Sequence, residues 1–189
     1  QAILHHPFNF IVGKAGSGKT LLACQVALQM LLEKHVNKII ITRPTISKED
    51  IGFLPGNLEE KMGPWVAPIY SNMFQLLRKE RVEQMIHNDQ IEIVPVSYMR
   101  GRTFVNSVVI VDECQNLEHD QTLMILQRIG INQNETSSQV VEIFMIDRNV
   151  AQGTVKGEEK VSFALAESTQ FANTLKLDVR MSNNWFCPE

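Results

Sequence analysis

The chain contains the stretch Phe8-Asn-Phe-Ile-Val-Gly-Lys-Ala-Gly-Ser-Gly-Lys-Thr20, in which an apolar run leads directly into a glycine-rich segment. From Gly13 onwards the stretch has the pattern G-x-x-x-x-G-K-T, which is that of the phosphate-binding P-loop. The apolar residues before it predict a strand, and apolar residues at helical spacing after it predict a helix that ends at about Lys34. Because a P-loop lies between a strand and a helix, this context supports the motif and predicts an α/β domain.

The residue types of the motif fit the chemistry of phosphate binding. Glycines let successive backbone N–H groups approach a phosphate, and the start of the helix adds its partial positive charge. The ammonium of Lys19 is expected to bridge the β- and γ-phosphates during catalysis, and the Thr20 hydroxyl is expected to ligate Mg²⁺. We therefore predict ATP contacts from Gly13, Lys14, Ala15, Gly16, Ser17, Gly18, Lys19 and Thr20.

An acidic pair supplies the second half of such a site. Asp112 and Glu113 follow the apolar run Val108-Val-Ile-Val111, as residues at the end of a buried strand would. Asp112 is expected to hold Mg²⁺ through water, and Glu113 to orient and deprotonate the attacking water. Gln115 lies within loop reach of the γ-phosphate and is predicted to sense it. Cys114 is interpreted as a small packed residue rather than a reactive thiol.

The rest of the chain alternates apolar runs with helical patterns, which is typical of a parallel α/β sheet. Asn57 is placed as a helix cap, with breaks expected at Pro64 and Pro68, and Gly130 is expected to cap a helix that carries 123–129. Further strands are predicted at 38–42, 91–94, 107–111, 140–146 and 174–179. Further helical patterns are predicted at 74–77, 82–86 and 161–171.

Composition limits what the chain can be. With 189 residues, 44% hydrophobic and 21% charged, it is expected to fold as one domain over residues 1–189, too short for the two motor domains of a monomeric helicase. Its three cysteines lack a C-x-x-C pair, which argues against a disulfide scaffold or a zinc site. No apolar run of membrane-spanning length and no secretory leader occurs, so we expect a cytoplasmic protein without a membrane partner. The net charge of −3 requires any nucleic-acid contact to come from a local patch.

A series of segments follows the P-loop in a distinctive order. These are Ile40-Ile-Thr-Arg-Pro44, Gly52-Phe-Leu-Pro-Gly56 with Glu59-Glu-Lys61, Tyr98-Met-Arg-Gly-Arg-Thr103, Val111-Asp-Glu-Cys-Gln-Asn116 and Leu126-Gln-Arg-Ile-Gly130. Together they resemble the PhoH-like family, the phosphate-starvation-inducible P-loop ATPases whose nucleotide core is similar to superfamily 1 helicases. The resemblance covers about residues 1–130. It implies Mg²⁺-dependent ATP hydrolysis on a three-layer, RecA-like, mostly parallel sheet with helices on both faces. It also implies work on RNA or single-stranded nucleic acid and a ring-shaped homo-oligomer, such as a hexamer.

Three further positions are assigned by this resemblance alone. Asp147 is expected beside the γ-phosphate, although the family's preceding glycine is missing and Gln152 comes two positions late. Gln1 is placed like the glutamine that reads the adenine edge in superfamily 1 helicases, the alternative being a disordered first-residue side chain. The segment Asp178-Val-Arg180 is one residue shorter than the family's Asp-Val-x-Arg, and Arg180 is predicted as a catalytic arginine.

A cationic loop is the candidate nucleic-acid surface. Arg100 and Arg102 flank Gly101 close to Tyr98, which combines two cations, a flexible backbone and a stacking ring. These side chains are predicted to contact a phosphate backbone and one stacked base, or the γ-phosphate of a neighbouring subunit's ATP; the alternative is a solvated loop. Arg43, at a strand's carboxyl end, is predicted to contact nucleic acid as well, the alternative being a structural ion pair.

A single P-loop domain rarely completes its own hydrolytic site, since an arginine from a neighbour contributes about 10³–10⁵ in rate. We therefore expect weak turnover as a monomer, with Arg180, Arg128, Arg100 and Arg102 as candidates in falling order. The leading hypothesis is an ATPase, helicase-related in its core and coupled to RNA or single-stranded nucleic acid. A nucleotide-gated RNA-binding module with vestigial hydrolysis is the alternative. A small-molecule kinase is a third, which Asp112-Glu113-x-Gln115 disfavours.

Overall fold

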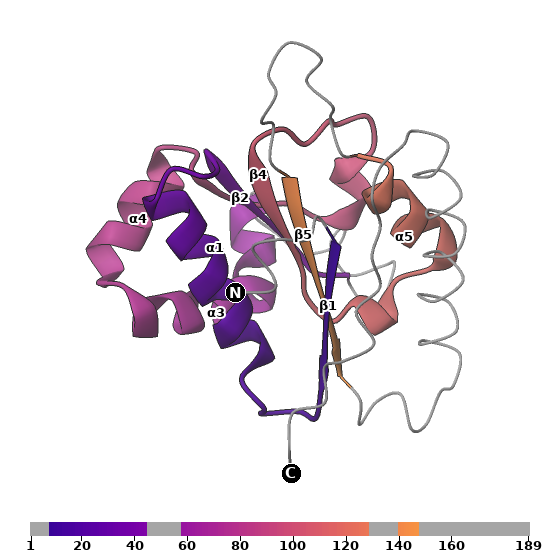
Figure 1. Cartoon of the computed structure of the whole chain (residues 1–189), viewed down its shortest axis with the longest axis horizontal. Coiled ribbons are helices and arrows are strands. Elements are labelled where there is room, and N and C mark those ends of the chain that lie inside the picture. Colours follow the sequence, from indigo (N-terminus) through magenta and orange to yellow (C-terminus); the bar gives the residue numbers. More distant parts are fainter. Residues whose placement is uncertain (1–7, 45–57, 129–139, 148–189) are drawn as a thin grey trace.

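The computed structural model describes residues 8–44, 58–128 and 140–147 (Figure 1). Several predicted features therefore lie outside the described residues. They are the Asn57 cap, the Gly130 cap, the helix at 161–171 and the last strand at 174–179. The strands predicted at 38–42 and 107–111 are confirmed residue for residue, and those at 91–94 and 140–146 are confirmed to within one residue.

All five strands of the described sheet are parallel. They are β1 (Phe8–Gly13), β2 (Lys38–Thr42), β3 (Ile91–Ile93), β4 (Ser107–Val111) and β5 (Val140–Asp147). Their spatial order is β1-β5-β4-β2-β3, so β5 separates the strand before the P-loop from the strand before Asp112. Every strand ends at the same edge because all run in one direction. The motifs at these carboxyl ends are thereby brought together, although they are far apart in the sequence.

Helices cover both faces of this sheet (Figure 1). One face carries α1 (Lys19–Leu32), α3 (Leu58–Leu76) and α4 (Lys79–His87). The other carries the short 3₁₀ turns η2 (Val96–Met99) and η3 (Cys114–Asn116) with α5 (His119–Leu126). The three-layer α/β architecture with a RecA-like parallel sheet is confirmed. None of the described helices is both long and apolar enough to cross a membrane.

Alternation along the strands builds two separate apolar cores. In β2, Ile39 and Ile41 face α1 and α3, whereas Ile40 faces η2 and α5. Successive side chains of a strand point to opposite faces, so a nearly continuous apolar run supplies both layers. This explains why the polar residues of β2 and β4, which are Lys38, Thr42 and Ser107, stand only at strand ends.

The expected breaks at Pro64 and Pro68 are wrong, because α3 continues through both prolines to Leu76. An interior proline costs about 3 kcal/mol by removing a helical hydrogen bond. Ile69 and Met73 are fully buried where α3 packs against α1, and each such side chain contributes about 2 kcal/mol. Tertiary packing therefore keeps the segment helical despite its poor local propensity.

The helix predicted over 123–129 occupies a different range. It begins at His119, where the backbone N–H of Glu118 donates to Gln121 Oε1 at 3.0 Å, and ends at Leu126. This capping contact is readable in the sequence as an acidic residue followed three positions later by glutamine. The apolar periodicity alone missed the first turn, because that turn is polar.

Candidate nucleotide-binding and catalytic site

The P-loop leaves β1 and enters α1 through two glycines in a left-handed conformation. Gly16 has a φ of 75° and Gly18 has a φ of 81°, and no neighbouring atom would obstruct a Cβ at either position. Backbone conformation, not space, thus requires glycine there. Gly13 differs, because an added Cβ would lie 2.8 Å from the Ser17 hydroxyl oxygen. Backbone conformation therefore accounts for Gly16 and Gly18, whereas a side chain at position 13 would require the Ser17 hydroxyl to shift.

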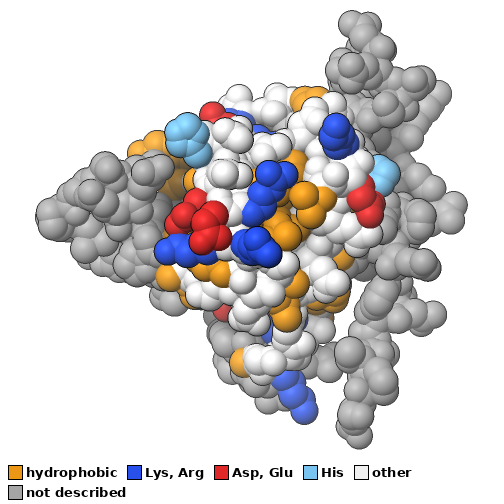
Figure 2. Space-filling view, turned by 90° about the vertical axis from the view of Figure 1, so that its left-hand side faces the viewer, with side chains coloured by type: hydrophobic (Ala, Val, Ile, Leu, Met, Phe, Trp, Pro, Cys, Tyr) orange, Lys and Arg blue, Asp and Glu red, His pale blue; other side chains and the backbone are white. Residues whose placement is uncertain are grey.

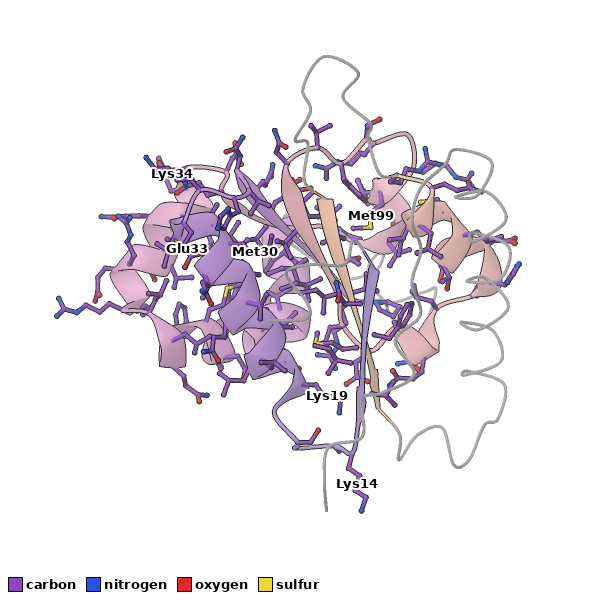
Figure 3. The ribbon with its side chains drawn as sticks, in the orientation of Figure 1. Lys14, Lys19, Met30, Glu33, Lys34 and Met99 are labelled. Atoms are coloured by element: carbon purple, nitrogen blue, oxygen red, sulfur yellow. The ribbon has the colours of Figure 1, made fainter. Side chains whose placement is uncertain are left out.

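Lys19, the first residue of α1, folds back over this loop. Its Nζ donates to the carbonyl oxygens of Gly13 at 2.9 Å and Lys14 at 2.8 Å. The side chain of Lys14 points away from the body of the protein (Figure 3). Only one of the two lysines of the motif is thus held at the loop. This ammonium is the positive charge that a bound phosphate would meet.

Asp112 comes directly after β4 and is 6% exposed. Its backbone N–H donates to Thr42 O at 2.9 Å, which continues the pairing of β2 with β4 by one residue. Burial raises the pKa of Asp112. The positive charge of Arg43 opposes this effect, and the negative charge of the neighbouring Glu113 carboxylate reinforces it. A buried carboxylate of this kind gains most from a cation in the pocket beside it.

Glu113 has a left-handed backbone, with φ 51° and ψ 39°. This conformation is uncommon for a residue other than glycine and is often found at functional sites. One carboxylate oxygen, Oε2, accepts a hydrogen bond from Gln115 Nε2 at 2.5 Å, and the other, Oε1, lies 3.6 Å from Arg43 Nη2. The two loop residues predicted to act near the γ-phosphate, Glu113 and Gln115, are therefore in direct contact.

A single cavity of about 330 Å³ joins these elements. Its lining residues are Ala15, Gly16, Gly18, Lys19, Thr20, Leu21, Asn72, Asp112, Glu113 and Met145. Three of them, Leu21, Asn72 and Met145, were not predicted. Asn72 belongs to α3, and its Nδ2 donates to Pro68 O at 2.7 Å. No sequence motif predicts Asn72 as a site residue, because its position depends on how α3 packs beside α1.

The backbone of Asp147 lies at the same edge. It ends β5 and pairs in register with Gly13, the first glycine of the P-loop. The register brings the backbone of this position next to the first glycine of the loop, and the expected place of Asp147 beside the γ-phosphate stays a prediction. Gln1, Gln152 and Arg180 lie outside the described residues.

The predicted cationic loop is divided between two environments. Tyr98 is 60% exposed and Arg100 is exposed. Arg102 instead forms two hydrogen bonds with Glu92, from Nη1 to Oε1 at 2.9 Å and from Nη2 to Oε2 at 2.8 Å. Lys38 Nζ lies 2.7 Å from the same Glu92 Oε2. Arg102 is thus a member of an ion-pair network, which leaves Arg100 as the exposed cation beside the tyrosine.

The remaining predicted positions are also placed. Arg43 forms an ion pair with Glu113, so its geometry matches the alternative expected for it, a structural ion pair. Arg128 donates from Nε to Met124 O at 3.2 Å, on its own segment. Cys114 is fully buried and burial raises the pKa of its thiol, which confirms it as a packed residue. Among the described residues, no group of three or more His, Cys, Asp or Glu side chains could hold a metal ion.

Comparison with known proteins identifies the family. The pattern described as "PhoH-like protein" matches residues 1–175. This chain belongs to the PhoH-like family. Members are P-loop ATPases, so the P-loop and the Asp112-Glu113 pair of this PhoH-like chain are the parts expected of a nucleotide site.

Three curated relatives show the extent of the similarity. A PhoH-like protein from Synechocystis sp. is 36% identical over 86% of this chain and 52% of its own length. A PhoH-like protein from Bacillus subtilis is 38% identical over 84% of this chain and 50% of its own length. Protein PhoH from Escherichia coli is 42% identical over 70% of this chain and 38% of its own length. The chain thus spans about half or less of the length of these relatives.

A solved structure, the bacteriophage Phi-29 viral genome packaging motor assembly, aligns with 78% of this PhoH-like chain and 46% of that chain. The TM-score is 0.47 at 13% sequence identity. Similarity at this level adds nothing to the family assignment, which rests on the family pattern and the curated relatives.

The residues of the cavity fit a nucleotide and its magnesium. A glycine loop with N–H groups, one ammonium held over that loop, a hydroxyl at Thr20 and a buried carboxylate at Asp112 are the groups that phosphate and Mg²⁺ require. The two groups that would hold the metal, the Thr20 hydroxyl and the Asp112 carboxylate, both offer oxygen atoms, which suit a hard cation.

Proposed function

We propose that this PhoH-like chain hydrolyses ATP with Mg²⁺ and couples that reaction to RNA or single-stranded nucleic acid. The observation that carries the proposal is the single cavity lined by Lys19 and Thr20 from one motif and by Asp112 and Glu113 from another. A binding loop alone would need only the first pair. The presence of a carboxylate beyond the metal position supports hydrolysis.

Each residue has a distinct task in this proposal. Lys19 would exchange its loop carbonyls for phosphate oxygens. Thr20 and Asp112 would hold Mg²⁺, which would stabilise the charge of the phosphates. Glu113 accepts a proton from the water whose oxygen attacks the γ-phosphorus, while the bond from that phosphorus to the ADP oxygen breaks. Gln115 holds the Glu113 carboxylate through the hydrogen bond to Oε2.

Nucleic-acid binding is assigned to a local surface. On the face that Figure 2 shows, the side of α4, positive and negative side chains are interspersed. This face therefore has no broad attraction for a polyanion, and the net charge of −3 of the chain supplies none overall. Exposed Tyr98 offers a ring for base stacking and Arg100 a cation for phosphate. We assign the strand contact to these residues together with Arg43.

A homo-oligomer, in the form of a ring such as a hexamer, is part of the proposal. An arginine from another copy would stabilise the charge that develops on the transferred phosphoryl group. Arg180 remains the first candidate by resemblance. Arg100, whose side chain is exposed, is the described candidate and would take this role in place of the strand contact. Native mass measurement with and without ATP and Mg²⁺ tests this part; a monomer under all conditions contradicts it.

Single-turnover phosphate release, measured with and without single-stranded RNA, tests the hydrolysis. We expect release that depends on Mg²⁺, rises with RNA and is lost in Glu113→Gln. Parallel reactions with single-stranded DNA distinguish the two nucleic acids. Binding of ATP without any release, in the presence of RNA, would instead support the nucleotide-gated binding module.

A further inference from the structure

Both carboxylate oxygens of Glu113 are engaged by side chains of the protein. Oε2 accepts from Gln115, and Oε1 faces the Arg43 guanidinium at 3.6 Å. A general base must present an oxygen to the water it deprotonates. The pair with Arg43 therefore restrains the group to which hydrolysis is assigned.

The backbone makes this pairing a consequence of the sheet. The hydrogen bond from Asp112 N to Thr42 O places the ends of β2 and β4 in register. Arg43 follows Thr42 and Glu113 follows Asp112, so both side chains extend from the same edge of the sheet. The left-handed backbone of Glu113 sets the direction in which its carboxylate departs.

Arg43 is also partly exposed to solvent. The Arg43 and Glu113 side chains are 24% and 30% exposed. An ion pair at 3.6 Å between partly exposed groups is weak and is easily replaced by a better partner. A phosphodiester is such a partner, because a guanidinium can bind two of its oxygens at once.

We propose that Arg43 is a positioning residue that restrains Glu113 until a phosphate of a bound single strand takes the guanidinium, and that this exchange links strand binding to hydrolysis. The proposal rests on the proposed function and adds the mechanism of its regulation. It requires that the strand and Glu113 compete for one side chain. It also requires that the strand reach the carboxyl end of β2.

The competition can be measured without ATP, by binding of fluorescein-labelled single-stranded poly-U RNA in the absence of Mg²⁺. We expect Glu113→Gln to bind about three- to fivefold more tightly than wild type and Arg43→Gln to bind more weakly. The double variant should bind as Arg43→Gln does. Glu83→Gln on α4 is the matched control, because Glu83 loses the same charge and its pair with Lys79 also measures 3.6 Å.

Two binding results would overturn the proposal. One is an affinity of Glu113→Gln no higher than that of Glu83→Gln. The other is an equal gain from Glu113→Gln in the Arg43→Gln background, which would show general charge repulsion instead of competition for Arg43. Circular dichroism and thermal unfolding of each variant verify that it is folded.

Turnover supplies the second measurement. Arg43→Gln should raise kcat without RNA by about three- to fivefold, leave KM for ATP within about twofold and abolish further stimulation by RNA. Arg43→Lys should retain part of the stimulation. A lower strand-free kcat in Arg43→Gln would contradict the restraint.

Failure of the proposed function is distinguishable from failure of this inference. A wild-type chain that binds the strand without hydrolysing ATP overturns the ATPase proposal, while the binding cycle still decides whether Glu113 and the strand share Arg43. A chain that hydrolyses ATP but does not bind the strand overturns the inference and leaves the ATPase.

Discussion

The ammonium nitrogen of Lys19 lies 2.9 Å from the carbonyl oxygen of Gly13, the residue that ends β1. One positive charge thus bridges the strand end and the start of α1, with Lys14 O as its second acceptor. Loop carbonyls are weaker partners for an ammonium than phosphate oxygens are. A bound phosphate can therefore take this ammonium from the two loop carbonyls.

Lys19→Ala should weaken binding of a fluorescent ADP analogue by about 10–100-fold, the value of a hydrogen bond to a charged group. Lys14→Ala is its control. The Lys14 side chain points away from the protein, so its loss should change affinity by no more than about twofold. Equal losses in both variants would mean that overall charge, not the position of Lys19, controls binding.

Asn72 is predicted to contribute to the nucleotide site from α3. Asn72→Ala should weaken nucleotide binding by about two- to tenfold, the range of one neutral hydrogen bond. Ser71→Ala is a close control, since Ser71 also bonds the carbonyl four residues earlier but does not line the cavity. Isothermal titration of ADP with both variants makes the comparison, and unchanged affinity in Asn72→Ala would remove this residue from the site.

Asp112→Asn is expected to stabilise the nucleotide-free protein at pH 7. Folding raises the pKa of Asp112, so ionised Asp112 costs folding free energy above its ordinary pKa, and this cost disappears at lower pH, where the carboxyl is protonated. The midpoint of thermal unfolding should therefore rise by about 2–4 °C at pH 7, with a smaller gain near pH 4. A lower midpoint at pH 7 would show that Asp112 is stabilised by contacts stronger than its burial penalty.

The ion-pair network of Glu92 should have the opposite dependence on pH. The hydrogen bonds from Arg102, followed by those from Lys38, lower the pKa of Glu92 to about 2 against a partial opposing effect of burial. Its stabilisation is thus present above pH 4.5 and is lost as the pH falls towards 2. Glu92→Gln should destabilise the protein at pH 7 by about 1 kcal/mol, because these side chains remain partly exposed.

Urea unfolding at pH 7 and pH 3 measures this difference, with Glu83→Gln as the control. Glu83 pairs with Lys79 on an exposed helical surface, so its variant should differ little from wild type at either pH. A Glu92→Gln penalty that persists undiminished at pH 3 would point to lost packing instead of lost charge.

Local patterns were sufficient for the elements that carry the motifs. The β-branched run of β2 and the apolar run of β4 predicted their bounds, and the glycine pattern predicted the turn into α1. These succeed because a strand buried on both faces and a left-handed turn each restrict the residues at their own positions. The same local patterns did not predict the polar first turn of α5 or the continuation of α3 through its two prolines.

The sequence by itself determined the phosphate loop, the acidic pair and the family, because each is written in consecutive residues. Only the tertiary structure decided which side chains meet across the sheet: Asn72 at the cavity, Arg43 at Glu113 and Arg102 at Glu92. Those contacts depend on the strand order β1-β5-β4-β2-β3 and on the packing of α3 against α1. Both are set by the burial of apolar surface over the whole sheet, a property that no short segment contains.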